Sequence, residues 1–138
     1  MIQVKVTVAA PQELVWECYT APEHVTQWNN ASPDWHSPKA ENDLRVGGRF
    51  NYRMEARDGS EGFDFTGVYD DVVPLERISY AMDDGRKVVT TFAPSENGVE
   101  VMTSFDPEHE NSRELQQSGW QAILDKFKQY TETQQSVV

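Results

Sequence analysis

Cysteine is almost absent from this sequence, because Cys18 is the only one among 138 residues. One cysteine cannot form a disulfide within the chain, which excludes a small fold held together by disulfides. Histidine is also rare, and His24, His36 and His109 do not occur at the spacings of metal ligands. We therefore expect no metal site and no bound cofactor, and we interpret Cys18 as a small apolar side chain.

Basic residues are also scarce, since 12 lysines and arginines stand against 23 aspartates and glutamates, for a net charge of −11. A field of this sign repels phosphate backbones, so we expect no nucleic-acid partner. It also disfavours association with anionic membrane surfaces. The charge does not identify the partner that the protein does bind.

Long apolar runs are missing as well. No segment approaches the roughly 20 apolar residues that span a bilayer, so we expect no membrane insertion. The first ten residues alternate between polar and apolar, unlike the continuous apolar run of a signal peptide. From these features we expect a cytoplasmic protein, either a monomer or a weak homodimer.

The composition is that of a folded chain, with 38% hydrophobic and 25% charged residues. A chain of 138 residues suits one domain and can bury a full core. No repeat, linker or low-complexity segment interrupts it. We therefore treat residues 1–138 as a single domain.

The first part of the chain predicts one strand followed by two short helices. Residues 2–8 alternate between apolar and polar, as a half-buried strand does. Pro11 and Pro22 each suit the first turn of a helix, and the two predicted helices end near Thr20 and Trp28.

Strand patterns then recur at the spacing of β-hairpins. The turn-forming pairs Asp58-Gly59, Asp84-Gly85 and Asn97-Gly98 separate them. Gly67 lies within one of these strands, where we expect a kink or a close approach of the backbone. The predicted strands cover residues 49–57, 62–73, 77–82, 87–93 and 99–105.

The end of the chain predicts one long helix from about Asn111 to Thr133, with Ser112 as its N-cap. An apolar stripe at helical spacing follows, formed by Leu115, Gly119, Trp120, Ile123, Leu124, Phe127 and Tyr130. The strands carry more inward aromatic surface than a thin sheet needs, and this helix is the only candidate to cover it. The sequence therefore predicts an α+β fold in which a curved antiparallel sheet wraps around the C-terminal helix.

Several short motifs give the chain a family resemblance. They are Pro11, Val15 and Trp16, then Pro22 and Trp28, the block Asp43 to Phe50, the pair Asp58-Gly59, the strand from Phe63 to Tyr69, and Gly119-Trp120. With these motifs the chain resembles the START-like (SRPBCC) superfamily. Within it, the chain looks like the family named after the activator of the heat-shock-protein-ninety ATPase.

This resemblance implies a helix-grip fold of the START-like or Bet v 1-like type. It also implies an elongated cavity between the sheet and the last helix, with the two short helices near its mouth. The superfamily includes lipid carriers, hormone-binding proteins and cyclases, so the resemblance indicates the fold more closely than the function.

Apolar side chains on the expected inward faces are the candidates for a cavity lining. They are Phe50, Tyr52, Met54, Phe63, Phe65, Tyr69, Tyr80, Met82, Trp120, Leu124 and Phe127. Ordinary core packing would select the same residue types. A ligand pocket is mostly apolar with a few placed polar groups, and the tyrosine hydroxyls in this set meet that description.

The segment from Asn29 to Glu41 contains two prolines and several polar turn-forming residues, so we expect an irregular loop. With Trp28 before it, this loop adds Trp35 and His36 to the binding candidates. Trp35 would either anchor the loop to the body of the protein or help to form a lid over a cavity. In the second interpretation, His36 would hydrogen-bond a ligand.

Three functions remain open on these observations. The first, which we favour, is binding of an apolar small molecule, lipid-like or polycyclic aromatic, between the sheet and the last helix. The second is a cyclase or hydratase that uses the same cavity, with His36 and Tyr80 handling protons. The third is a chaperone-linked protein-interaction module, which the family name alone suggests. No serine, cysteine or threonine occurs in a recognisable nucleophile motif, so no catalytic residue is assigned.

Overall fold

The computed structural model describes residues 1–135. Its elements in chain order are β1 (Ile2–Val8), α1 (Gln12–Thr20), α2 (Pro22–Trp28), β2 (Trp35–Asn42), β3 (Arg49–Ala56), β4 (Gly62–Val73), β5 (Arg77–Met82), β6 (Lys87–Ser95), β7 (Gly98–Phe105) and α3 (Arg113–Gln135).

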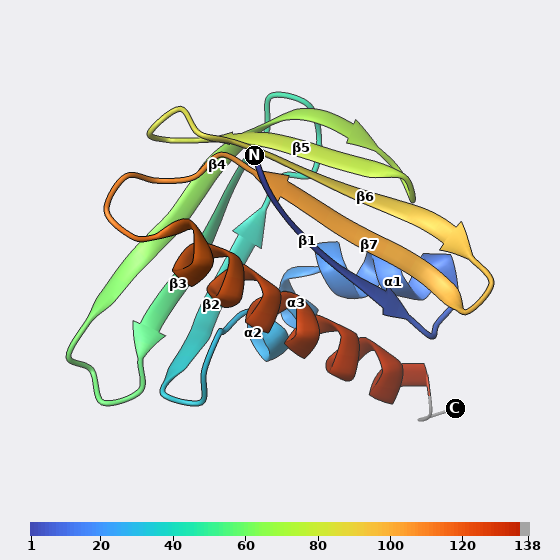
Figure 1. Ribbon diagram of the computed structural model, residues 1–138, viewed down its shortest axis with the longest axis horizontal. Coiled ribbons are helices and arrows are strands. Elements are labelled where there is room, and N and C mark those ends of the chain that lie inside the picture. Colours follow the sequence, from blue (N-terminus) through green and yellow to red (C-terminus); the bar gives the residue numbers. More distant parts are fainter. Residues whose placement is uncertain (136–138) are drawn as a thin grey trace.

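All seven strands form one antiparallel sheet in the order β1-β7-β6-β5-β4-β3-β2. The sheet curves over the three helices, and α3 runs along its concave side next to β1 (Figure 1). The short helices α1 and α2 contact α3 and fill the rest of that side. The predicted helix-grip fold is therefore confirmed.

Strand alternation places one apolar face on the concave side of the sheet. Val4, Phe50, Phe92 and Val101 are buried there, while their sequence neighbours face the solvent. From α3, Phe127 has no exposed surface, and its ring lies 5.0 Å from that of Trp28, centroid to centroid. This contact joins α3 to α2 under the sheet.

The structure corrects the prediction of an irregular loop from Asn29 to Glu41, because most of that segment is strand β2. The prediction was wrong because proline argues against a strand. Pro38 lies between His36 and Lys39, at the point where the β2–β3 register shifts. β2 is the last strand of the sheet and pairs only with β3. An edge strand tolerates proline because one side of its backbone has no ladder to complete.

The expected close approach at Gly67 is confirmed. A Cβ atom placed on Gly67 would lie 2.8 Å from the Ala81 carbonyl oxygen and 2.8 Å from Cε1 of Phe50. Both distances are shorter than side-chain atoms tolerate. The missing side chain thus lets the Phe50 ring lie directly against β4.

The N-terminus of α3 confirms one prediction and corrects another. The Ser112 hydroxyl oxygen accepts a hydrogen bond from the Leu115 N–H at 3.1 Å, as an N-cap does. Leu115, however, is 59% exposed and does not belong to the apolar face. Gln116 is buried in the first turn instead, and its amide holds the preceding segment through the backbone of Glu108 and Asn111.

Two substitutions on α3 test how the fold is held together. Phe127→Ala removes a fully buried ring, so we expect it to lower the free energy of unfolding by about 3–5 kcal/mol. Leu115→Ala, on the same helix but exposed, should change it by less than about 0.5 kcal/mol. Urea denaturation followed by far-ultraviolet circular dichroism measures both. Equal effects of the two substitutions would contradict this packing.

Candidate functional site

A cavity of about 230 Å³ lies between the concave face of the sheet and α3. Strands β3, β4 and β5 supply eight of its seventeen lining residues, and the others come from α1, α2 and the residue after it, α3, β1 and β7. The lining residues are Val4, Tyr19, Thr20, Trp28, Asn29, Phe50, Tyr52, Met54, Phe63, Phe65, Tyr69, Ile78, Tyr80, Thr103, Trp120, Ile123 and Leu124.

Ten of the fourteen residues that the sequence suggested for a binding site lie in this wall. They are Trp28, Phe50, Tyr52, Met54, Phe63, Phe65, Tyr69, Tyr80, Trp120 and Leu124. They come from five different elements, and the curvature of the sheet brings them together around one space.

The other four residues lie elsewhere. Phe127 is core, packed against Trp28 and away from the cavity surface. Met82 packs against the core without lining the cavity. Trp35 does not line it either, although its ring lies 6.0 Å from that of Phe63.

His36 faces away from the cavity. It pairs with Glu55 across β2 and β3, and its Nε2 lies 4.0 Å from a carboxylate oxygen of that residue. Met54 and Ala56, the neighbours of Glu55 in β3, point to the opposite face, and Met54 lines the cavity. His36 is therefore not placed to hydrogen-bond a ligand in this cavity.

The centre of the aromatic wall is Phe50. Its ring lies 4.7 Å from the ring of Tyr80, 5.3 Å from Tyr69, 5.1 Å from Tyr52 and 5.7 Å from Phe65, centroid to centroid. These are the tilted and edge-to-face arrangements that aromatic pairs favour. The rings hold one another in place, so the wall presents a continuous aromatic surface to the cavity.

Four tyrosine hydroxyl groups give this apolar wall its polar character. Tyr19 shares a hydrogen bond of 3.3 Å with Thr90, and Tyr52 accepts one of 3.2 Å from Asn42 Nδ2. Burial is the main cause that raises the pKa of Tyr19, Tyr52, Tyr69 and Tyr80 above the ordinary value. Tyrosine hydroxyls are protonated at neutral pH and can donate hydrogen bonds, and the raised pKa values extend this state to alkaline pH.

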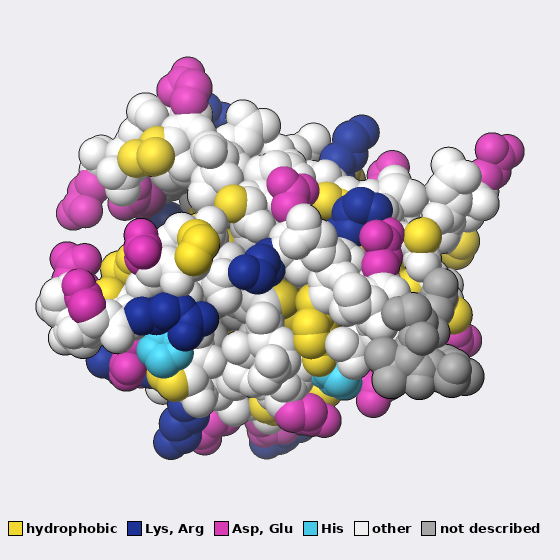
Figure 2. Space-filling view, turned by 90° about the horizontal axis from the view of Figure 1, so that it is seen from below, with side chains coloured by type: hydrophobic (Ala, Val, Ile, Leu, Met, Phe, Trp, Pro, Cys, Tyr) yellow, Lys and Arg dark blue, Asp and Glu magenta, His cyan; other side chains and the backbone are white. Residues whose placement is uncertain are grey.

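The cavity opens at the end of the sheet where the β3–β4 hairpin and the β5–β6 turn lie. Phe63, at the start of β4, lines the cavity and is also 50% exposed, so the cavity reaches the surface there. The space-filling view is notched on its left, the side on which Figure 1 shows the segment before α3 (Figure 2). Acidic side chains lie around the margin of that view, and hydrophobic side chains show as separate small patches.

Sequence reasoning missed two kinds of residue at this site. Tyr19 and Thr103 lie on elements that were not assigned to the cavity, and only the three-dimensional packing brings them to it. Arg86 lies beside Tyr80 on the concave face, just after a turn. The signal for Arg86 in the sequence was the alternation of side chains on either side of the β5–β6 turn. Met82 and Arg86 stand opposite each other across that turn, so their side chains lie on the same face of the sheet.

A curved antiparallel sheet that grips a C-terminal helix, with a cavity between them, defines a START-like protein. The family model described as "Activator of Hsp90 ATPase homolog 1-like protein" matches residues 9–132, and the chain belongs to this family. Comparison with curated proteins finds no match.

Solved structures agree with this assignment. The chain is similar to the AHSA1-like protein from Aeromonas hydrophila, with 43% identity and a TM-score of 0.91 over 97% of this chain and 93% of that one. It is similar to Chr148 from Cytophaga hutchinsonii, with 50% identity and a TM-score of 0.83 over 99% and 95%. A protein of unknown function from Staphylococcus aureus shares the fold at 18% identity, with a TM-score of 0.72 over 98% and 94%.

The buried tyrosines predict a loss of stability at alkaline pH. An unfolded chain releases a tyrosine proton near pH ~10, whereas the folded protein retains it because the pKa is raised. The folded state then binds more protons above pH ~10, so the free energy of unfolding is unaffected below that pH and falls above it. The loss is about 1.4 kcal/mol per pH unit for each such tyrosine.

Because lysines titrate in the same range, the test compares the wild type with Tyr69→Phe. Urea denaturation at pH 9 and pH 11.5 should show about 2 kcal/mol more loss in the wild type than in the variant. Identical losses in the two proteins would show that Tyr69 does not retain its proton in the folded state.

Proposed function

We propose that this protein binds an apolar small molecule, lipid-like or polycyclic aromatic, in the cavity between the sheet and α3. The observation that carries the proposal is the cavity of about 230 Å³ with its largely aromatic wall. Protein interiors are close-packed and leave few voids larger than a water molecule. A space of this size, lined by Phe50, Phe65 and Trp120, is therefore more than a packing defect.

The volume limits the size of the ligand. An engineered apolar cavity of about 150 Å³ holds one benzene molecule, whereas drug-sized ligands occupy about 300–1,000 Å³. The present cavity lies between these values, which favours two fused rings or a medium-length acyl chain over a whole phospholipid. Met54 in the wall adapts its shape readily, so ligands of somewhat different outline fit the same space.

A hydratase or cyclase would use the same cavity, and one observation favours Tyr80 over His36 as its proton donor. Tyr80 lines the cavity, whereas His36 faces outward toward Glu55. The Tyr80 hydroxyl is protonated at neutral pH and can donate a hydrogen bond to a developing oxyanion, while burial raises its pKa and makes it a weaker acid. A catalytic role for Tyr80 would require turnover that Tyr80→Phe abolishes without weakening ligand binding.

The oligomeric state and the location expected from the sequence agree with this proposed function. A protein that holds its ligand in an internal cavity needs no partner subunit, in keeping with a monomer or weak homodimer in the cytoplasm. No helix within residues 1–135 has the length and apolar character to cross a membrane. The small separate hydrophobic patches in Figure 2 favour a small-molecule ligand over a chaperone-linked protein partner on that face.

Filling the cavity should abolish binding without unfolding the protein. Ile123 lines the cavity and is half-buried, so Ile123→Trp places an indole in the ligand space. The matched control is Leu115→Trp, on the exposed side of the same helix. Neutral probes of two shapes, 2-naphthol and 1-octanol, are titrated while tryptophan fluorescence is followed, because Trp28 and Trp120 both touch the cavity.

We expect the wild type and Leu115→Trp to bind at least one probe with similar affinity, and Ile123→Trp to bind neither. In urea denaturation, a probe at 100 times its Kd should add about 2.7 kcal/mol to the stability of the first two proteins. Absence of binding by the wild type, or unchanged binding by Ile123→Trp, would refute the proposed cavity.

A further inference from the structure

Arg86 points toward the concave side of the sheet, although the other described strand cations face outward. The Met82 N–H donates a hydrogen bond of 2.8 Å to the Arg86 carbonyl oxygen, so the two residues stand opposite each other. The next pair on the same face is Tyr80 and Val88. Val88 is buried and Tyr80 lines the cavity, so this is the inward face.

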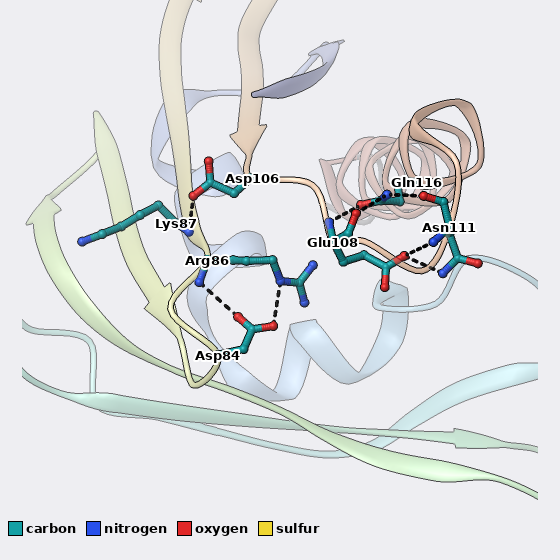
Figure 3. A network of polar contacts seen from close by, with 7 residues as sticks. All are labelled: Asp84, Arg86, Lys87, Asp106, Glu108, Asn111 and Gln116. Atoms are coloured by element: carbon teal, nitrogen blue, oxygen red, sulfur yellow. Dashed lines mark hydrogen bonds and ion pairs between the residues drawn. The ribbon is translucent and has the colours of Figure 1, made fainter.

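The guanidinium group of Arg86 has donors to spare. Its Nε donates to a carboxylate oxygen of Asp84 at 2.8 Å, which fixes the side chain. The two terminal nitrogens have no hydrogen-bond or ion-pair partner within residues 1–135. Figure 3 shows the group held beside Asp84, with its free end on the side of the β5–β6 turn that faces the segment containing Glu108 and Asn111.

This group lies on the cavity side of the sheet, one residue pair beyond the cavity-lining Tyr80, at the end of the β5–β6 hairpin. Its side chain is 25% exposed, so the guanidinium lies at the boundary between protein and solvent. The stem of such a side chain covers apolar surface while its charged end stays hydrated. Phe63, which marks the opening, belongs to the same end of the sheet.

The Tyr80 hydroxyl is the second available donor. It lines the cavity and makes no hydrogen bond to any side chain or backbone group in the described part of the chain. The positive charge of Arg86 acts on it and lowers its pKa, against the larger opposite effect of burial. Tyr80 and Arg86 are also diagonal neighbours on one face of the β5–β6 hairpin, since Tyr80 pairs with Val88 and Met82 stands opposite Arg86.

The cavity wall itself contains no charged side chain among the residues described, so a group that pairs with an ion there must come from beside the wall, as Arg86 does next to Tyr80. Guanidinium donors match the two oxygens of a carboxylate, and hydrogen bonds to a charged acceptor are the stronger kind. A ligand with an apolar body in the aromatic cavity and a carboxylate at the mouth of that cavity would contact both the aromatic wall and Arg86.

We propose that the ligand is an amphipathic carboxylic acid, whose carboxylate binds Arg86 and the Tyr80 hydroxyl at the mouth while its apolar body occupies the cavity. This inference rests on the proposed function and adds the chemical class of the ligand. A net charge of −11 repels anions in general, so a local cation is needed for an acid to enter.

The test uses matched acids and neutral amides: 2-naphthoate with 2-naphthamide, and octanoate with octanamide, at pH 7. Calorimetric titration compares the wild type with Arg86→Gln, Arg86→Lys, Tyr80→Phe and Arg49→Gln. Arg49→Gln is the charge-matched control, because Arg49 pairs with Asp83 next to the same turn and is exposed.

We expect Arg86→Gln to weaken acid binding about 10-fold or more, and amide binding less than about twofold. Arg86→Lys should recover part of the acid affinity, since the charge is retained but not the paired donors. Tyr80→Phe should weaken acids and amides alike, because both present a carbonyl oxygen to the hydroxyl. Arg49→Gln should leave both affinities within about twofold.

The outcomes separate the two proposals. If amides bind and Arg86→Gln weakens acids no more than amides, the carboxylate site is refuted while the apolar cavity stands. The carboxylate site is equally refuted if Arg49→Gln weakens acid binding as much as Arg86→Gln does. If no acid or amide binds the wild type, both proposals fail.

Discussion

The contact of α3 with the two short helices determines the rest of this structure. Phe127 has no exposed surface and meets the rings of Trp28 and Tyr19 at 5.0 and 5.3 Å. This end of the helix is therefore close-packed, which sets its distance from the sheet. Two turns earlier, the Trp120 ring stacks on Phe105 of β7 with centroids 4.0 Å apart, and it lies 6.3 Å from the β4 ring of Phe65. The helix is thus held against β1 and β7, and the cavity lies on its other side, toward β3, β4 and β5.

The polar groups in the wall explain why the remaining space does not collapse. The Tyr80 hydroxyl lines the cavity and has no hydrogen-bond partner within the described residues, so an apolar group packed against it would leave it without one. Burying a hydroxyl without a hydrogen-bond partner costs about 1–3 kcal/mol by mutational measures. Gly67 contributes from the backbone, because its missing side chain leaves room for the Phe50 ring next to β4. The cavity is thus maintained by the chemistry of its wall as well as by the backbone.

Sequence patterns predicted much of this fold because its strands and helices follow simple periods. Alternation located β3 to β7, and the Ser112 cap located the start of α3. β2 was missed because Pro38 is compatible with a strand only at a sheet edge, which is a property of the assembled sheet. The family resemblance implied the cavity, but residue types alone do not separate the residues that line it from those that fill the core. Phe50 and Phe127 look alike in sequence, yet one lines a space and the other fills the core.

Arg86 illustrates how the fold allows a charge on an apolar face. A guanidinium at the position of Tyr69, deep in the sheet, would lose its hydration and require a buried partner at considerable cost. At the end of β5 and β6, the turn itself supplies Asp84 as a partner, and solvent reaches a quarter of the side chain. In the proposed site, polarity consequently runs from the charge of Arg86 beside Tyr80 to the aromatic interior around Phe50 and Trp28. This gradient gives the proposed ligand a direction, since only an acid that enters apolar end first places its carboxylate against Arg86.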